Sequence, residues 1–381
     1  MTDFASLGLS APLLKAIASQ NFTQPYPIQT EVIPAVLKGK DILGIAQTGS
    51  GKTASFVLPI LEMLLSANAP KNRHISGLIL VPTRELAVQI GEVLVNFGTD
   101  LPRKIKSLAV FGGVSINPQM MKLQGVEILV ATPGRLIDLV EHKAVHLSEV
   151  KMLVIDEADK MLNLGFQDEM AYIFRLLPTK RQNLLFSATL GKDVNSVTEF
   201  LLHDPIKIEI KPEAQHLDLI TQIAYLVSEE RKGNVLRYLI KTQDMKQVLV
   251  FTSSVHKADA VVNKLNKNGI ESKAFHSEKS QGARTEALNK FKSGKLRVLV
   301  ATDLASRGID IQFLPFVINY ELPRSPKDYI HRIGRTGRAE AAGQAISLIC
   351  TEDEAHFKVI QKKMKKEVNL IATNDLNLHG F

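Results

Sequence analysis

Short runs of apolar residues alternate with helical stretches along most of the chain. In its first half, the apolar runs are "DILGIA", "GLILVP", "SLAVFGG", "VEILVAT", "KMLVIDE" and "NLLFSAT". Continuous apolar runs of this length are typical of central parallel strands that are covered on both faces. Helical stretches such as "RELAVQIGEVLVNFG" and "GRLIDLVEH" lie between them. The alternation therefore predicts an α/β fold built on an open parallel sheet.

The pattern pauses once and then restarts. Residues 207–219, "KIEIKPEAQHLDL", are polar and contain Pro212, and they interrupt the apolar period. The alternation resumes with "KQVLVFTSS", "SKAFHS", "LRVLVATD", "PFVINYEL" and "GQAISLIC", separated by helices that end at Asn268-Gly269 and at Gly294. We therefore predict two α/β domains, each with its functional loops at the carboxyl ends of its strands. The cleft between two such domains is a natural ligand site.

The two domains are expected within the following boundaries. An N-terminal region is expected at 1–30, a first domain at 31–209, a linker at 210–218, a second domain at 219–355 and a tail at 356–381. The tail begins with a basic stretch. Its lysines are expected to form a solvated helix face, with contact to RNA as the alternative.

Composition narrows the class of protein. The chain has 381 residues, with 45% apolar and 23% charged residues, which suits two globular domains. Its net charge of +8 hints at a polyanionic partner. Cys350 is the only cysteine, so no disulfide can form within the chain. No signal peptide or membrane-length apolar run is evident, and the expected location is the cytosol.

A glycine-rich segment points to a phosphate site. The segment "AQTGSGKT" follows an apolar run and precedes a helical stretch, which is the context of a P-loop. Lys52 is expected to reach the β- and γ-phosphates, and Thr53 to offer its hydroxyl to Mg²⁺. The alternative is a glycine-rich turn that binds nothing. The expected nucleotide-binding residues of this segment are Ala46, Gln47, Thr48, Gly49, Ser50, Gly51, Lys52 and Thr53.

Three acids follow another apolar run in "VIDEADKML", residues 154–162. Acids at the end of a buried strand are costly unless they hold something cationic. The segment resembles a Walker B strand, in which Asp156 faces Mg²⁺ and Glu157 positions or deprotonates the attacking water. The alternative is a solvated acidic turn, which the preceding apolar run disfavours.

The letters "DEAD" at 156–159 name the family that this chain resembles, the DEAD-box RNA helicases of superfamily 2. The resemblance covers essentially the whole chain. The overall layout of the chain is most similar to that of bacterial RhlE-like members. This resemblance implies two tandem RecA-like domains, each a parallel sheet covered by helices. The supporting motifs, in chain order, are "NFTQPYPIQ" with Phe4 upstream, "PTRELA", Gly112-Gly113, "TPGR", "SAT", "VLVFTSS", "SQGAR", "ATDLASRGID" and "YIHRIGRTGR".

The resemblance also assigns roles around the nucleotide. Gln29 would hydrogen-bond the adenine edge and Phe22 would stack on its ring, although "PYPIQ" is also a rigid turn before a helix. Asp310 would bind the ribose. Arg335 and Arg338 would be arginine fingers; the alternatives are a basic helix surface or an RNA phosphate contact. The implied catalytic residues are Lys52, Asp156, Glu157, Arg335 and Arg338, whereas Arg332 is not assigned as a finger.

Two further groups come from the resemblance. Asp159, Ser187, Thr189 and His331 would couple the nucleotide state to RNA binding, although a lone histidine is usually structural. RNA backbone contacts are implied for Arg84, Gly113, Thr132, Arg135, Gln281, Arg284, Thr302 and Asp303. Such contacts carry little sequence specificity. The absence of Trp and the 6% aromatic content argue against a base-stacking platform.

The expected function is that of an ATP-dependent RNA helicase, which hydrolyses ATP to ADP and phosphate and locally unwinds short RNA duplexes. ATP and single-stranded RNA together would close the two domains. Two alternatives remain: an ATP-gated RNA clamp with little unwinding, and a DNA-translocating helicase of the same superfamily. A monomer is the default. Departures from the family pattern at Asn21, Tyr26, Ser277 and Ser306 leave the catalytic groups in place.

Overall fold

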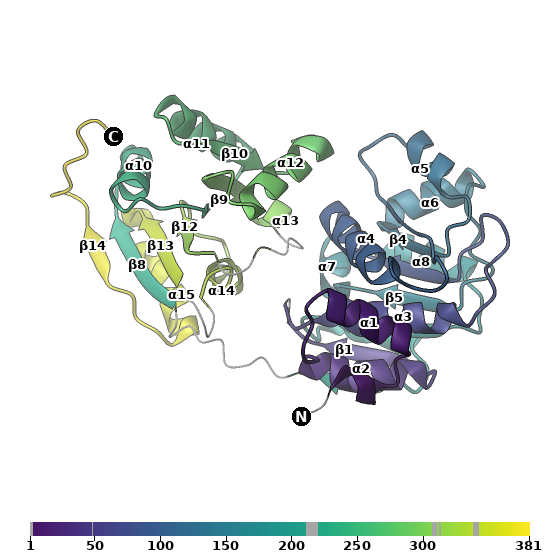
Figure 1. Cartoon of the computed structure of the whole chain (residues 1–381). Helices are drawn as coiled ribbons and strands as arrows, with labels where there is room; N and C mark the ends of the chain where they lie inside the picture. Colours follow the sequence, from purple (N-terminus) through teal and green to yellow (C-terminus); the bar gives the residue numbers. More distant parts are fainter. Residues whose placement is uncertain (1–2, 48, 211–219, 307–310, 312–313, 338–342) are drawn as a thin grey trace. The chain divides into compact units, whose positions relative to one another are not determined.

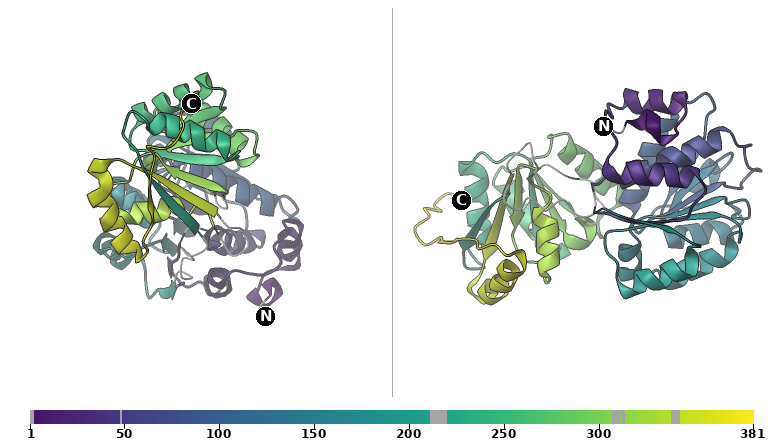
Figure 2. Two further views of the ribbon diagram at one scale, coloured as in Figure 1. Left: turned by 90° about the vertical axis from the view of Figure 1, so that its left-hand side faces the viewer. Right: turned by 90° about the horizontal axis from the view of Figure 1, so that it is seen from below.

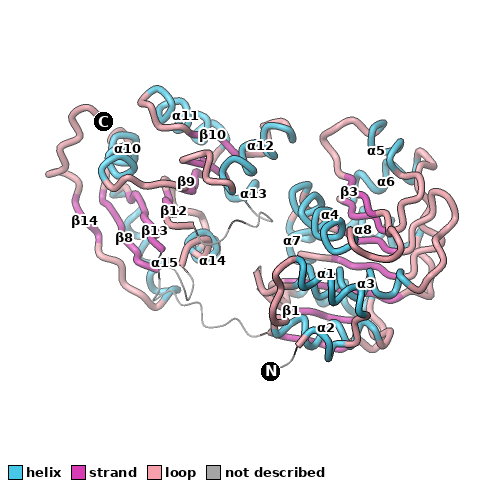
Figure 3. Tube along the Cα trace, in the orientation of Figure 1, coloured by secondary structure: helices cyan, strands magenta, loops and turns pink. Residues whose placement is uncertain are grey.

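The chain divides into two compact units, Met1–Pro212 and Glu213–Phe381 (Figure 1). The computed structural model describes residues 3–47, 49–210, 220–306, 311, 314–337 and 343–381. In both units, helices flank a sheet of strands (Figure 3). Among the described residues, no helix has the length and apolar character needed to cross a bilayer.

A parallel sheet of seven strands forms the centre of the first unit, in the order β3-β4-β2-β5-β6-β1-β7. Six of the strands coincide with the apolar runs that predicted them, and all the pairings are parallel. The strands are β1 Ile42–Ile45, β2 Gly77–Leu80, β3 Ser107–Val110, β4 Ile128–Ala131, β5 Met152–Ile155, β6 Gln182–Ser187 and β7 Ile206–Glu209.

Helices cover both faces of this sheet (Figure 2). They are α1 Ala11–Ser19, α2 Pro27–Leu37, α3 Lys52–Leu65, α4 Arg84–Gly98, α5 Asn117–Lys122, α6 Pro133–Glu141, α7 Ala158–Asn163, α8 Gln167–Leu176 and α9 Lys192–Leu201, preceded by the 3₁₀ turn η1 Phe4–Leu7. Side chains of η1 and α1–α4 pack into one apolar cluster, and side chains of α6–α9 pack into another.

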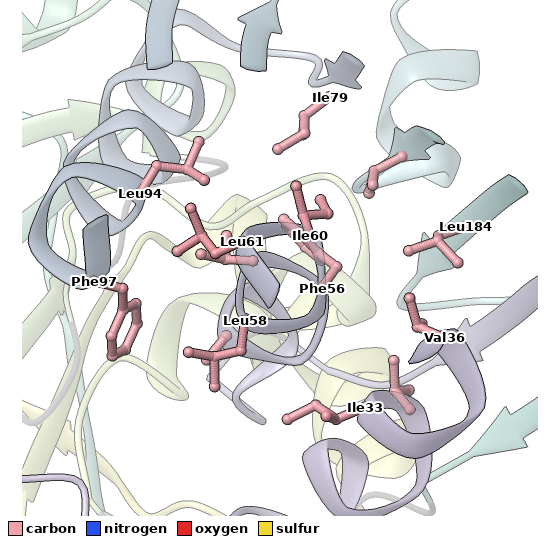
Figure 4. Packing of buried hydrophobic residues seen from close by; sticks show 14 of the residues in the cluster. Ile33, Val36, Phe56, Leu58, Ile60, Leu61, Ile79, Leu94, Phe97 and Leu184 are labelled. Carbon is pink, nitrogen blue, oxygen red and sulfur yellow. The ribbon is translucent and has the colours of Figure 1, made fainter. Parts of the chain in front are cut away.

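Consecutive strand residues alternate between these two clusters. Leu184 belongs to the cluster of α1–α4, whereas Leu185 belongs to the cluster of α6–α9. Figure 4 shows the first cluster, in which Phe56 and Ile60 of α3 lie among residues from α2, α4 and the sheet. Because both faces of a strand are buried, its sequence is continuously apolar rather than alternating.

The second unit repeats this plan with a seven-stranded sheet in the order β10-β11-β9-β12-β13-β8-β14, again with parallel pairings. Together the two units confirm the predicted pair of RecA-like α/β domains. The strands are β8 Ile220–Leu226, β9 Val248–Thr252, β10 Ser272–Phe275, β11 Val298–Thr302, β12 Phe316–Asn319, β13 Gly343–Ile349 and β14 Leu370–Ala372.

Its helices end where the glycines predicted. Gly269 and Gly294 each have φ of +72°, a left-handed conformation that follows a helix end at little cost in glycine. The helices are α10 Lys232–Thr242, α11 Val255–Lys267, α12 Gln281–Lys292, α13 Asp303–Ser306, α14 Pro326–Ile333 and α15 Glu354–Met364, with the 3₁₀ turn η3 Thr351–Asp353.

The predicted tail is packed into the second unit. Phe357, Ile360 and Met364 of α15 are buried, while Lys358, Lys362 and Lys363 are exposed on its other face. Strand β14 then pairs with β8, and the Thr373 hydroxyl donates to the Leu226 carbonyl over 2.7 Å. The apolar pattern did not predict β14, because the strand has only three residues and all of them are exposed.

Candidate nucleotide and RNA-binding site

The P-loop joins the end of β1 to the start of α3. Gly51 caps α3 with φ of +87°, and a Cβ atom there would lie 2.6 Å from Gln29 Nε2 and 2.9 Å from the Tyr26 ring. A residue with a side chain would therefore be both strained and crowded. Lys52, the first residue of α3, is buried and donates a hydrogen bond from Nζ to the Ala46 carbonyl. Thr48 lies outside the described residues.

The "DEAD" segment begins at the end of β5, which is separated from β1 by β6 alone. The carboxyl ends of parallel strands meet at one edge of the sheet, so the acids and the P-loop lie at neighbouring positions. The Glu157 backbone N–H donates to Asp156 Oδ1 over 2.9 Å, and Glu157 has φ of +56°. This conformation is uncommon outside glycine, and such strain is often found in functional sites.

The two adjacent carboxylates have different surroundings. Glu157 Oε1 accepts a hydrogen bond from Lys160 Nζ over 2.6 Å, whereas Glu157 Oε2 is buried and has no hydrogen-bond partner in the described part of the chain. Burial raises the pKa of Asp156 to about 6; Lys52 lowers it, and the neighbouring charge of Glu157 raises it again. Both acids are therefore suited to a cation or a polar reactant rather than to a dry core.

This donor set fits a magnesium ion. Mg²⁺ prefers oxygen ligands and is commonly held by one or two carboxylates together with substrate phosphates. Asp156 supplies a carboxylate that is 3% exposed, and Thr53 supplies a hydroxyl from the first turn of α3. Glu157, the next residue after Asp156, adds a buried Oε2 that has no hydrogen-bond partner among the described residues.

Gln29 connects the N-terminus of α2 to the P-loop. Its Nε2 donates to the Gly51 carbonyl over 3.1 Å, and its Oε1 accepts from the Tyr26 backbone N–H over 2.9 Å. Phe22 lies nearby in sequence and packs against Phe97 of α4, with 5.6 Å between the ring centroids. The predicted adenine-binding amide is thus fully buried and aligned by the backbone of two helix N-termini.

The predicted coupling residues of the first unit contact one another. Thr189 Oγ1 donates to Asp159 Oδ2 over 2.9 Å, and Ser187 Oγ donates to the Thr189 carbonyl over 2.7 Å. Asp159 follows β5 and Ser187 ends β6. The "DEAD" and "SAT" segments are therefore joined through side chains.

The predicted RNA contacts of the first unit begin two helices. Arg84 starts α4 after β2, and Thr132 precedes α6 after β4, a neighbouring strand of the sheet. Gly113 has φ of +75°, and a methyl group there would overlap the Arg84 guanidinium. Arg135 is buried, with Nε bonded to Asp138 Oδ2 at 3.2 Å and an Nη to the Val114 carbonyl at 2.7 Å.

The second unit repeats this placement. Gln281 starts α12 after β10, and Thr302 ends the adjacent strand β11 just before Asp303 starts α13. Gln281 and Arg284 are 8% and 7% exposed, and the Arg284 guanidinium lies 4.9 Å from the centre of the Phe275 ring. Helix N-termini that follow parallel strands present backbone N–H groups, which suit phosphates.

Asp303 has a further partner that the motif did not predict. Arg332 of α14 donates hydrogen bonds to both carboxylate oxygens of Asp303, at 2.6 and 2.7 Å. It also donates to Asn319 Oδ1 at 3.0 Å. The Arg332 guanidinium stacks on Phe251 at 4.9 Å and is 2% exposed. This buried, fully engaged side chain agrees with leaving Arg332 out of the fingers.

Two of the remaining predicted residues, His331 and Arg335, lie at or just after the end of α14. His331 is exposed near the end of α14, and Arg335 is half-buried just beyond it. The Arg335 carbonyl accepts a hydrogen bond from the Leu314 N–H over 3.1 Å. Asp310 and Arg338 lie outside the described residues. Lys160 was not among the predicted residues, and its only signal in the sequence is its spacing of three residues from Glu157.

Comparisons with known proteins agree with this geometry. Residues 26–197 match the family model "DEAD/DEAH box helicase", and residues 231–340 match "Helicase conserved C-terminal domain". The chain is 38% identical over 369 residues to the ATP-dependent RNA helicase CshA of Listeria monocytogenes, covering 97% of this chain and 70% of the relative. It is 39% identical over 377 residues to RhpA of Helicobacter pylori, a DEAD-box ATP-dependent RNA helicase, covering 98% and 75%.

Solved structures extend the similarity to the fold. The structure of S. cerevisiae Dbp5 bound to RNA and ADP BeF3 matches with a TM-score of 0.84 at 30% identity, covering 100% of this chain and 98% of that one. The RhlE-like subtype stays a prediction, since the relatives named here are CshA and RhpA. The motifs, their placement at the strand ends and these similarities together show that the chain belongs to the DEAD-box family of ATP-dependent RNA helicases.

Proposed function

We propose that this protein hydrolyses ATP to ADP and phosphate in a reaction that depends on bound RNA, and that it uses the cycle to separate short RNA duplexes. The observation that carries this proposal is the hydrogen bond between Thr189 and Asp159. This hydrogen bond joins the segment that contains the hydrolytic acids to the segment after β6. A movement of one segment can therefore change the position of the other.

Each catalytic side chain has a proposed task that suits its surroundings. Lys52 exchanges its hydrogen bond to Ala46 for the β- and γ-phosphates, while the N–H groups at the start of α3 bind phosphate oxygens. Glu157 uses its unpartnered Oε2 to orient the attacking water and accept its proton, with Lys160 fixing the other oxygen. Gln29 is proposed to read the adenine edge.

We propose Asp156 and Thr53 as the residues that hold Mg²⁺ with the nucleotide. When bound, the ion supplies positive charge that neutralises the phosphate oxygens. Burial of Asp156 prepares this carboxylate for such a partner, because its charge is poorly solvated in the protein alone. From the second unit, Arg335 and Arg338 are proposed to stabilise the charge that develops on the γ-phosphate.

The proposed RNA surface reads the sugar-phosphate backbone. In both units, the predicted residues other than Gly113 lie at or near helix N-termini after adjacent strands, where N–H groups, hydroxyls and arginines suit phosphates. Little sequence specificity is therefore expected. A monomer in the cytosol, related to the RhlE-like type, remains part of the proposal.

The proposal is tested by steady-state ATP hydrolysis with and without single-stranded RNA. The wild type should be strongly stimulated by RNA, and Glu157→Gln should lose that activity while still binding ATP. Glu92→Gln makes the same charge change on the exposed surface of α4 and should behave as wild type.

If RNA does not change the rate of ATP hydrolysis, the proposed coupling between RNA binding and hydrolysis is contradicted. Strand displacement on a short RNA duplex then separates a helicase from a clamp that hydrolyses ATP without unwinding. Processive ATP-dependent movement on DNA would favour the DNA-translocating class instead.

A further inference from the structure

The carboxylate of Asp259 on α11 binds two side chains of a different segment. Asp259 Oδ1 accepts a hydrogen bond from His276 Nε2 over 3.2 Å. The same oxygen forms an ion pair with Lys279 Nζ at 2.8 Å. Both partners belong to residues 276–280, which connect β10 to α12. One acid therefore anchors a five-residue connection to a neighbouring helix.

The connection is held at a buried point. His276 is 1% exposed and directly follows Phe275, the last residue of β10. Its ring nitrogen that faces the carboxylate carries the hydrogen, since a carboxylate only accepts. The Lys279 backbone N–H donates to the His276 carbonyl over 3.2 Å, so the two partners of Asp259 also fix each other.

The same connection determines how α12 begins. Ser280 caps the helix by accepting the Ala283 N–H over 3.3 Å, and the first turn carries Gln281 and Arg284. The Arg284 guanidinium stacks on Phe275, the residue before His276. A shift of residues 276–280 would therefore move both predicted RNA contacts of this helix.

The anchor is charged under ordinary conditions. Burial is the largest single influence and raises the pKa of the Asp259 carboxyl, but the hydrogen bonds and charges of Lys279 and His276 together outweigh it and leave the pKa below its usual value. A charge-assisted bond is stronger and better directed than a neutral one, which suits an anchoring role.

We propose that Asp259 is a positioning residue for RNA binding, which acts through His276 and Lys279 to orient Gln281 and Arg284 at the start of α12. This inference rests on the proposed RNA contacts of α12. Asp259 touches neither nucleotide nor RNA in this scheme, so its effect should appear in the RNA dependence of the reaction alone.

The sign of the effect separates positioning from simple electrostatics. Asp259→Asn removes a negative charge, and a more positive protein should bind RNA more tightly if charge alone matters. Loss of the contacts from Asp259 to His276 and Lys279 should instead weaken RNA binding. A matched control exists on α12, where Glu286 accepts ion pairs from Lys273 at 2.7 Å and Lys290 at 2.8 Å. Glu286→Gln makes the same charge change without touching residues 276–280.

The experiment measures ATP hydrolysis of the full chain against RNA concentration. For Asp259→Asn, we expect the RNA concentration for half-maximal stimulation to rise roughly threefold to tenfold. The KM for ATP and the rate at saturating RNA should stay within about twofold of wild type. Glu286→Gln should bind RNA as well as wild type or slightly better, and Asp259→Glu should recover part of the loss.

Arg284→Gln, alone and combined with Asp259→Asn, distinguishes the proposed RNA contact of Arg284 from the proposed positioning role of Asp259. If Arg284→Gln alone leaves the RNA dependence unchanged, the proposed RNA contact itself is wrong. If Arg284→Gln weakens RNA binding but Asp259→Asn matches Glu286→Gln, the contact stands and the positioning role is overturned. If both weaken binding, their effects should be less than additive in the double variant, because Asp259 then has less to position.

Discussion

Thr189 Oγ1 donates a hydrogen bond to Asp159 Oδ2 over 2.9 Å and so bridges the segments that follow β6 and β5. Asp159 lies two residues after Glu157, and Ser187 Oγ fixes the Thr189 carbonyl at 2.7 Å. This hydrogen bond can transmit a movement of either segment, because neither side chain can shift far unless the bond breaks or the other side chain moves with it.

Thr189→Val tests this bridge with an almost isosteric change. The hydroxyl is lost while the shape is kept, so basal ATP hydrolysis should stay within about twofold, whereas RNA strand displacement should fall roughly tenfold. The measurement is displacement of a short labelled duplex at saturating ATP. Thr198→Val is the control, since the Thr198 hydroxyl donates to the Val194 carbonyl within α9. Equal losses in both variants would argue against a special role for Thr189.

Gly113→Ala should weaken RNA binding. At φ of +75° an alanine is strained by about 1–2 kcal/mol, and its methyl group would displace the Arg84 guanidinium. We expect a higher RNA concentration for half-maximal ATPase stimulation and an unchanged KM for ATP. Gly112→Ala is the matched control, because a Cβ atom there meets nothing within 4 Å. The prediction fails if the two variants have the same RNA dependence.

Magnesium-dependent nucleotide binding should weaken as pH falls through about 6. The pKa of Asp156 is raised to about 6 chiefly by burial, and only the deprotonated carboxylate can hold the ion. Below that pH, the Mg²⁺ concentration needed for half-maximal binding of a fluorescent ADP analogue should rise by up to roughly tenfold per pH unit. Asp156→Asn should show only the pH dependence that belongs to the nucleotide. A wild-type requirement for Mg²⁺ that matches this variant at every pH would contradict the assignment.

The same carboxyl should destabilise the nucleotide-free fold at neutral pH. Its pKa is about 6 in the folded protein against an ordinary 3.8, so the folded state binds the proton more tightly. Stability therefore rises as pH falls through 6 and levels off below 3.8. Asp156→Asn should unfold at a higher urea concentration at pH 7.5, with a gain of at most about 3 kcal/mol. The gain should shrink towards pH 4.5.

An exposed acid provides the control for that experiment. Asp204 has a side chain that is 98% exposed, so Asp204→Asn should leave the unfolding transition unchanged. If Asp156→Asn is no more stable than wild type at pH 7.5, burial does not penalise the charge of this acid.

Sequence patterns predicted most of the central strands because those strands are buried on both faces. The exception is β8, in which only three of seven residues are buried. The run "KMLVIDE" contains β5, and "RELAVQIGEVLVNFG" coincides with α4. Strands β7 and β14 escaped prediction, each at one edge of its sheet, whereas β3 and β10 at the opposite edges were predicted. In β7, Ile208 alone is buried, and the strand lies partly within the stretch that suggested the linker. Because β7 and β14 expose most of their residues, they lack the long buried apolar run of a central strand.

The candidate site divides in a similar way. Motif residues such as Lys52 and Asp156 were predictable because phosphate and metal chemistry demands particular side chains at fixed spacing. Their supporting partners were not, because any of several residues could serve. Nothing in the sequence requires Lys160 to bind Glu157, Arg332 to grip Asp303 or Asp259 to hold His276. The last two pairs depend on which strands become neighbours, and the first depends on the rotamers that its two side chains adopt.

The place of β14 at the edge of the second sheet has a consequence for synthesis on the ribosome. Strand β8 is the first of its unit to be made, yet its neighbours β13 and β14 are made more than a hundred residues later. Until they emerge, β8 has unpaired backbone groups on both sides, which invites pairing with other nascent chains. The first unit faces a similar delay, since β1 waits for β6 and β7. Each unit should therefore complete its sheet late, and a pause in translation before β13 should favour aggregation more than a pause after β14.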